Sequence, residues 1–127
     1  MSSQNLTLRL GVLISGSGSN LQAIIEAIKT QQLPDVEIVL VVSNKADAYG
    51  LQRALKHKLP AIYLPWTQRP VKEQYIVPAI TVSRPTMSES ESRLTALLQL
   101  FRVDVIVLAG WMRILSAPFL EQFPQRV

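Results

Sequence analysis

Four short runs of aliphatic residues alternate with segments of helical spacing, and this alternation limits the fold more than any other feature. The runs span residues 8–15, 37–43, 61–64 and 103–109. They are largely apolar at both even and odd positions, so a strand formed by each is buried on both faces. Such strands occur in parallel sheets with helices packed on each side. The alternation therefore predicts an α/β protein with a doubly wound, Rossmann-like parallel sheet.

The segments between these runs have the features of helices. A first helix, ending near Thr30, places four aliphatic side chains on one stripe: Leu21, Ile24, Ile25 and Ile28. We expect Asp47 to cap a short second helix. A capping-box pattern at residues 88–91 begins a third helix, and a short fourth helix follows at about residues 116–123.

Composition and length narrow the class of protein. The 127 residues suit one domain, residues 1–127, with an irregular loop at about residues 66–87. The chain has no cysteine and one histidine, which excludes thiolate and multi-histidine metal sites, so we expect no metal. The apolar runs are shorter than the roughly 18 residues of a membrane span. With no signal-peptide pattern at the start, these features predict a cytoplasmic protein without a membrane partner.

The charge pattern favours a small ligand over nucleic acid. The formal net charge is +4, and the basic residues are spread singly along the chain. Proteins that bind nucleic acid usually gather lysine and arginine on one face. A mild positive excess of this kind fits an anionic small molecule equally well. We therefore expect small-molecule substrates and no nucleic-acid partner.

The expected strand order directs attention to two turns. Right-handed crossovers give the order 3-2-1-4, which places the first and fourth strands side by side where the winding reverses. Ligands in such sheets bind beyond the carboxyl ends of the strands at this point. The turns at residues 15–20 and 110–115 should therefore face each other across one crevice.

The first turn has the sequence SGSGSN. Gly16 and Gly18 allow a positive φ and a close approach to a ligand. Ser19 and Asn20 would begin the helix, where unpaired N–H groups and the helix dipole favour an anion. Two interpretations are open. Gly18, Ser19 and Asn20 bind a phosphate, or the segment is a tight turn with a serine cap.

The second turn, GWMRIL, also has two interpretations. Met112, Ile114 and Leu115 around Arg113 suggest a partly apolar pocket for a flat aromatic ligand. Alternatively, Trp111 and Met112 cover the core and Arg113 points to solvent.

Other polar residues offer weaker candidates. Lys45, after the second aliphatic run, could attract an anion, although a polar turn with Asp47 as helix cap is the simpler interpretation. His57 fits a solvated residue at a helix end better than a catalytic base. No paired carboxylates or Ser/His/Asp set stand where acid–base catalysis would need them.

Three segments, taken together, resemble the phosphoribosylglycinamide formyltransferase family of purine biosynthesis. They are VLISGSGSNLQAII, VVSNKADAYGL and VDVIVLAGWMRILS. The resemblance covers nearly all of the chain except about residues 66–92. It implies the same doubly wound fold and transfer of a formyl group from 10-formyltetrahydrofolate to the amino group of N1-(5-phosphoribosyl)glycinamide in IMP synthesis.

The resemblance also implies roles for single residues. It assigns Gly18, Ser19 and Asn20 to the ribonucleotide phosphate. It assigns four residues to the formylfolate: Met112, Arg113, Ile114 and Leu115. The family has another folate-contacting arginine before the fourth strand, and Arg84 or Arg93 could correspond to it.

One departure from the family concerns catalysis. The family's catalytic asparagine, histidine and aspartate align beyond Val127, so the resemblance assigns no catalytic residue here. We expect a truncated, amino-terminal part of the enzyme that binds ligands while formyl transfer is impaired.

An exposed apolar fourth strand would favour low solubility or a homodimer. A non-catalytic phosphate-binding remnant is the alternative. The GSGSN turn argues against a formyltetrahydrofolate deformylase, which needs no ribonucleotide site.

Overall fold

The computed structural model describes residues 7–66, 88–111, 113 and 115–127. Its elements alternate between strand and helix throughout. They are β1 (Leu8–Ile14), α1 (Ser19–Lys29), β2 (Val36–Ser43), α2 (Tyr49–Lys56), β3 (Ala61–Tyr63), α3 (Glu89–Leu100), β4 (Val105–Leu108) and α4 (Ala117–Glu121). Within the described ranges, no helix has the length and apolar character needed to cross a lipid bilayer.

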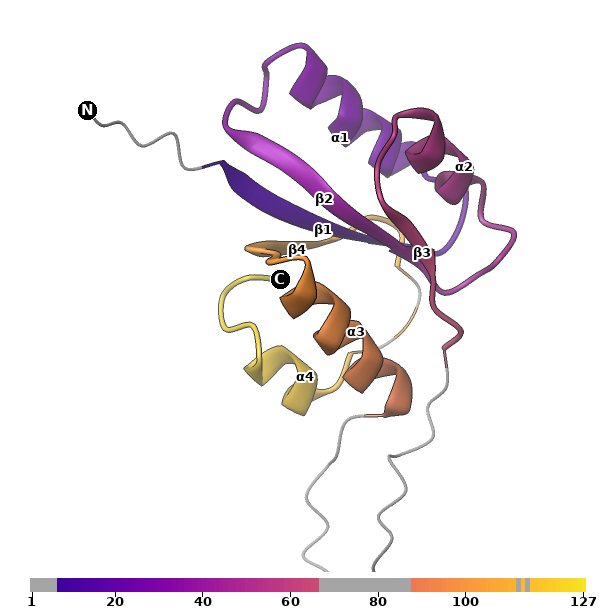
Figure 1. Ribbon diagram of the computed structural model, residues 1–127, viewed down its shortest axis with the longest axis vertical. Helices are drawn as coiled ribbons and strands as arrows, with labels where there is room; N and C mark the ends of the chain where they lie inside the picture. Colours follow the sequence, from indigo (N-terminus) through magenta and orange to yellow (C-terminus); the bar gives the residue numbers. More distant parts are fainter. Residues whose placement is uncertain (1–6, 67–87, 112, 114) are drawn as a thin grey trace, which may run out of the picture.

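The strands form one parallel sheet with the order β3-β2-β1-β4 (Figure 1). This order confirms the prediction made from strands that are apolar on both faces. β1 lies between β2 and β4, and its residues Val12, Leu13 and Ile14 are completely buried. β1 and β2 are therefore the inner strands of the sheet, and most of their residues are buried.

Helices cover both faces of the sheet, with α1 and α2 on one side and α3 and α4 on the other (Figure 1). Each face has its own apolar cluster. Val12 and Ile14 pack with α1 and α2, while Leu13 packs with Leu94 and Leu98 of α3. The alternating directions of successive side chains in β1 thus supply both cores.

Two helix starts follow the expected capping chemistry and one does not. In α3, the Ser88 hydroxyl accepts a hydrogen bond from the N–H of Glu91, and the Glu91 carboxylate accepts one from the N–H of Ser88. In α4, the Ser116 hydroxyl caps the helix, with a proline in the first turn. The predicted Asp47 cap is wrong. Ala48 occupies the cap position of α2, and no side chain caps that helix.

The apolar run at residues 103–109 is longer than β4 and extends beyond the strand at both ends. Val103 precedes the strand and is buried in the core. The Asp104 carboxylate accepts a hydrogen bond of 2.9 Å from the N–H of Arg9, which fixes the register of β4 against β1. Of the loop expected at about residues 66–87, all but Trp66 lies outside the described residues.

Candidate functional site

The two turns singled out from the sequence leave adjacent strands at one edge of the sheet. β1 and β4 pair in parallel from Leu10 with Val105 to Leu13 with Leu108. The N–H of Ala109 then donates a 2.9 Å hydrogen bond to the Leu13 carbonyl. The turns at residues 15–20 and 110–115 therefore begin beside each other at the carboxyl ends of these strands.

The first turn is shaped by contact between two glycines from different helices. Gly18 has a φ of 76° and precedes α1 as its cap residue. A Cβ on Gly18 would lie 2.5 Å from the Cα of Gly50, at the start of α2. The N–H of Gly50 also donates a 3.1 Å hydrogen bond to the Gly16 carbonyl. Both the backbone conformation and the available space therefore require glycine at position 18.

The amino end of α1 is exposed, and no side chain among the described residues caps it. Ser19 and Asn20, its first two residues, are exposed to solvent, and neither Asp nor Glu stands in the first turn. Main-chain N–H groups of a first helical turn point along the axis and carry the positive end of the helix dipole. This end of α1 can therefore donate hydrogen bonds to an anion that approaches from the carboxyl edge.

Arg53 of α2 supports the same turn, and sequence reasoning did not find it. Its Nε donates a 2.8 Å hydrogen bond to the Ser17 carbonyl. Its Nη1 lies 3.5 Å from Oε1 of Gln22, and its guanidinium lies 4.7 Å from the centre of the Tyr49 ring. Arg53 is distant in sequence and belongs to no local motif, so only the packing of α1 beside α2 reveals it.

The segment after β2 forms a compact polar turn. The Ser43 hydroxyl accepts a 3.0 Å hydrogen bond from the N–H of Lys45 and donates one of 2.9 Å to the Lys45 carbonyl. Asn44 is buried, and its Oδ1 has no hydrogen-bond partner in the part of the chain that the structure describes. The Lys45 side chain is exposed, which agrees with a polar turn in which that lysine is solvated.

The second turn, at residues 110–115, begins at Gly110, which has a φ of 81°. Trp111 packs against the core beneath α3 and meets Trp66 edge-to-face, with ring centroids 5.0 Å apart. Arg113 is exposed, and Leu115 packs against the same core. Met112 and Ile114 lie outside the described residues. Trp111 thus covers the core and Arg113 is exposed, as expected from the second of the two interpretations of this turn.

A buried carboxylate joins the end of this turn to α3. Glu91 is only 4% exposed. Its Oε2 accepts a 2.7 Å hydrogen bond from the N–H of Ser116, while Oε1 accepts the bond from Ser88 that completes the capping box. The sequence pattern predicted the capping box, but the link to Ser116 depends on how α3 and α4 pack together.

The remaining candidate residues lie apart from these turns. Arg93 is exposed on α3, and Arg84 lies outside the described residues. His57 follows α2 as its C-cap residue and contacts Lys29 near the opposite edge of the sheet. Among the described residues, no group of three or more His, Cys, Asp or Glu side chains is placed to hold a metal ion.

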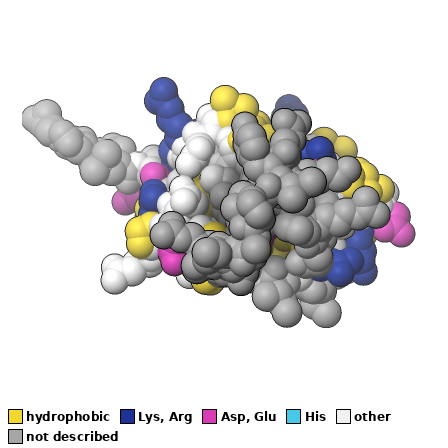
Figure 2. Space-filling model, turned by 90° about the horizontal axis from the view of Figure 1, so that it is seen from below, with side chains coloured by type: hydrophobic (Ala, Val, Ile, Leu, Met, Phe, Trp, Pro, Cys, Tyr) yellow, Lys and Arg dark blue, Asp and Glu magenta, His cyan; other side chains and the backbone are white. Residues whose placement is uncertain are grey.

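The basic side chains visible on one face of the molecule are dispersed. In Figure 2, Lys and Arg side chains lie at separate places around the rim of the visible face, not in one patch.

Comparison with known proteins gives a consistent result. The family model described as "Formyl transferase" matches residues 8–127. Phosphoribosylglycinamide formyltransferase of Saccharomyces cerevisiae is 43% identical over 119 residues, which cover 90% of this chain and 53% of that protein. The trifunctional purine biosynthetic protein adenosine-3 of Drosophila pseudoobscura pseudoobscura is also 43% identical, over 94% of this chain and 8% of its own length.

Solved structures show the same likeness. The crystal structure of glycinamide ribonucleotide transformylase 1 from Symbiobacterium toebii superposes with a TM-score of 0.72 at 36% identity. That match covers 97% of this chain and 50% of the other. The chain therefore spans about half the length of the single-function relatives it matches. Sequence and fold together place the chain in the formyl transferase family.

Proposed function

We propose that the chain is the substrate-binding part of a phosphoribosylglycinamide formyltransferase of de novo purine biosynthesis. The reaction moves a formyl group from 10-formyltetrahydrofolate to the amino group of N1-(5-phosphoribosyl)glycinamide. The amino nitrogen bonds to the formyl carbon, the bond from that carbon to the folate nitrogen breaks, and the amine's proton passes to the folate nitrogen. The names of the relatives support this activity. Residues 1–127 would form one domain of a cytoplasmic enzyme.

The observation that carries the proposal is the uncapped amino end of α1 beside the carboxyl end of β4. We assign Gly18, Ser19 and Asn20 to the phosphate of the ribonucleotide. The exposed first turn lacks acidic residues, so a phosphate meets no like charge there. Gly18 brings the backbone close to the ligand, and Arg53 holds the turn through the Ser17 carbonyl.

The turn after β4 would hold the folate. We assign four residues to it: Met112, Arg113, Ile114 and Leu115. The exposed guanidinium of Arg113 would meet a carboxylate or a ring edge of the folate, and Leu115 would supply apolar contact. No residue in the chain is assigned to proton transfer. We therefore expect ligand binding by the 127-residue polypeptide and strongly reduced formyl transfer.

Calorimetric titration with N1-(5-phosphoribosyl)glycinamide tests the phosphate site. Ser19→Asp places a negative charge where the phosphate would bind, so affinity should fall by about tenfold or more. Asn20→Ala should weaken binding to a smaller degree. Gln32→Glu adds the same charge beyond the far end of α1 and is the matched control, expected to stay within about twofold. Unchanged binding in Ser19→Asp would overturn the phosphate assignment.

A second titration, with 10-formyltetrahydrofolate, separates the two halves of the site. Arg113→Ala should weaken folate binding severalfold and leave ribonucleotide binding intact. Ser19→Asp should weaken ribonucleotide binding and leave folate binding intact. If the chain binds the ribonucleotide and no folate under any condition, the non-catalytic phosphate-binding alternative is supported.

A further inference from the structure

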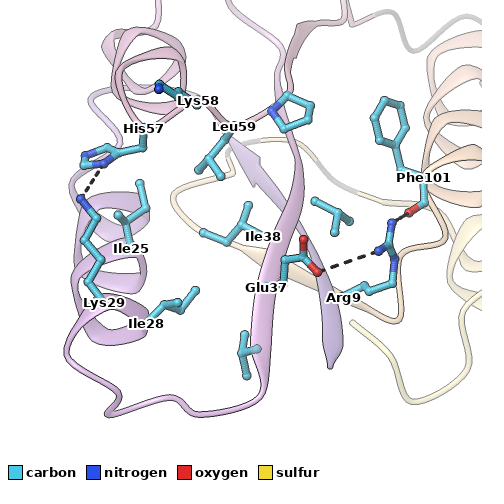
Figure 3. Close-up of a pocket in the computed structure, with 13 residues that line it drawn as sticks. Arg9, Ile25, Ile28, Lys29, Glu37, Ile38, His57, Lys58, Leu59 and Phe101 are labelled. Atoms are coloured by element: carbon cyan, nitrogen blue, oxygen red, sulfur yellow. Dashed lines mark hydrogen bonds and ion pairs between the residues drawn. The ribbon is translucent and has the colours of Figure 1, made fainter. Parts of the chain in front are cut away.

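A cavity of about 530 Å³ lies at the edge of the sheet opposite the candidate functional site (Figure 3). The carboxyl ends of α1 and α2 and the beginning of β2 surround it. We call it the basal cavity and define it by Ile28, Lys29, Ile38, Lys58 and Leu59. Volumes of this size are typical of pockets for small organic ligands.

The basal cavity exists because β3 is short. β3 pairs with β2 only from Val41 to Ser43. In the described sheet, no strand therefore lies beside the first half of β2 on that side. The chain instead turns away through Leu59 and Pro60, and the N–H of Val41 donates to the Pro60 carbonyl. The space that a longer β3 would fill stays open.

The inner wall of the cavity is apolar. Ile25 of α1 and Ile38 of β2 are each 5% exposed, and Ile28 and Leu59 are half-buried beside them. Figure 3 shows these four side chains between α1 and β2. An apolar group in the cavity would therefore be removed from water on this side, which favours binding.

The cavity is lined by one carboxylate, Glu37, and by several cationic groups, of which Lys29 and Lys58 have no acidic partner among the described residues. Among the described residues, the one ion pair joins Arg9 to Glu37 at 3.9 Å, across β2 from Lys29. Arg9 is further occupied by hydrogen bonds to the carbonyls of Phe101 and Arg102. The ammonium of Lys29 instead lies 2.9 Å from Nδ1 of His57, and no carboxylate of the described ranges forms an ion pair with it.

The carbonyl groups at the carboxyl end of α2 do not bind the lysine ammonium groups either. Lysines at helix ends often interact with free carbonyl groups of the last turn. Here main-chain N–H groups already bond to those carbonyls. The Ala54 carbonyl accepts from His57 and Leu59, and the Leu55 carbonyl accepts from Lys58. Among the described residues, the ammonium of Lys29 therefore has only the His57 ring nitrogen as partner and that of Lys58 has none, so both can bind an anion from outside.

We propose that the basal cavity binds a small molecule with one carboxylate and an apolar body. The apolar body lies against Ile25, Ile28 and Ile38, and the carboxylate bonds to Lys29 and Lys58. This site is distinct from the edge assigned to the ribonucleotide and folate. It does not depend on the proposed enzymatic function.

A matched pair of probes tests the site: 4-phenylbutanoate and its neutral amide, 4-phenylbutanamide. Each is titrated into the 127-residue chain labelled at isoleucine methyl groups and followed by NMR. We expect the acid to shift the methyl signals of Ile25, Ile28 and Ile38, with the amide bound about tenfold more weakly. Equal binding of the two probes, or no shift at these methyl groups, would overturn the proposal.

Two double variants identify the charges involved. Lys29→Gln with Lys58→Gln should weaken binding of the acid by about tenfold, as expected for two partly solvated ion pairs. Lys45→Gln with Lys56→Gln removes the same net charge at exposed lysines outside the cavity and should change the affinity less than twofold. A loss of equal size in both variants would show non-specific attraction and reject the site.

Discussion

At the scale of single residues, the glycines of the candidate site differ in what a side chain would meet. Gly18 has a positive φ, and a Cβ added to it would collide with the backbone of Gly50. Gly110 has a positive φ but open space around it, and Gly16 has open space and no such φ. Three alanine substitutions therefore separate conformational strain from steric conflict.

We expect Gly18→Ala to lower the free energy of unfolding by about 2–4 kcal/mol, since strain and overpacking add. Gly110→Ala should lower it by about 1 kcal/mol, the cost of a left-handed conformation alone. Gly16→Ala should stay within about 0.5 kcal/mol of the parent. Urea unfolding followed by tryptophan fluorescence measures all three. Three equal values would contradict this account of the turn.

The need for glycine in this turn could be predicted from SGSGSN, because a turn between a buried strand and a helix has few alternatives. The reason that Gly18 in particular cannot change was not predictable. It depends on Gly50, which the fold brings from α2. The same limit explains why Arg53 was missed: its partners Ser17 and Gln22 lie more than 30 positions away.

At the scale of elements, Glu91 connects two helices that local patterns treat as separate. Its carboxylate accepts main-chain hydrogen bonds from Ser88 and from Ser116. The first bond begins α3, and the second fixes the residue that caps α4. The position of the turn after β4 therefore depends on a side chain in α3.

Replacing Glu91 should consequently cost more than the loss of an ordinary cap. We expect Glu91→Ala to lower the free energy of unfolding by about 2–4 kcal/mol, because one buried and one partly buried N–H group lose a charged acceptor. Glu89→Ala removes a neighbouring carboxylate of the first turn and should cost about 0.5 kcal/mol. Thermal and urea unfolding of both variants give the comparison. Similar losses would mean that the Ser116 contact contributes little.

Local sequence predicted helix starts well where a second residue supported the cap, as Glu91 does for Ser88 and Pro118 does for Ser116. The Ser88–Glu91 pattern satisfies two main-chain groups at once, and it forms as expected. The prediction for Asp47 used a single residue type, and the helix begins one position later without it. A lone capping residue competes with solvent and with alternative turns, so it specifies a boundary weakly.

At the scale of the whole molecule, β4 is the outer strand of the described sheet. One main-chain bond reaches it from the carboxyl-terminal segment, where the N–H of Ile106 donates to the Arg126 carbonyl. Leu108 is 46% exposed. An apolar outer strand with free main-chain groups favours pairing with a second copy.

We therefore expect the 127-residue polypeptide to form a homodimer or larger species as its concentration rises. Leu108→Lys should shift it toward monomer, since charge on an outer strand opposes pairing. Leu55→Lys, at another exposed leucine on α2, is the control and should not. Sedimentation velocity over a range of concentrations distinguishes these outcomes. A parent chain that stays monomeric at high concentration would contradict the expectation.

The overall fold was predictable because strands that are apolar on both faces allow few arrangements. The strand order followed from that pattern and from the handedness of crossovers. The basal cavity was not predictable. It depends on β3 pairing over three positions only, and the run at residues 61–64 contains no sign of where pairing stops.

The division of the two apolar clusters by the sheet has an evolutionary consequence. One cluster is filled by α1 and α2 and the other by α3 and α4, with strand residues alternating between them. Stability changes at well-separated positions add nearly independently. Substitutions accumulated in one layer thus need no compensation in the other. The sequences of the two helix layers can therefore diverge at different rates while the strands between them stay the same.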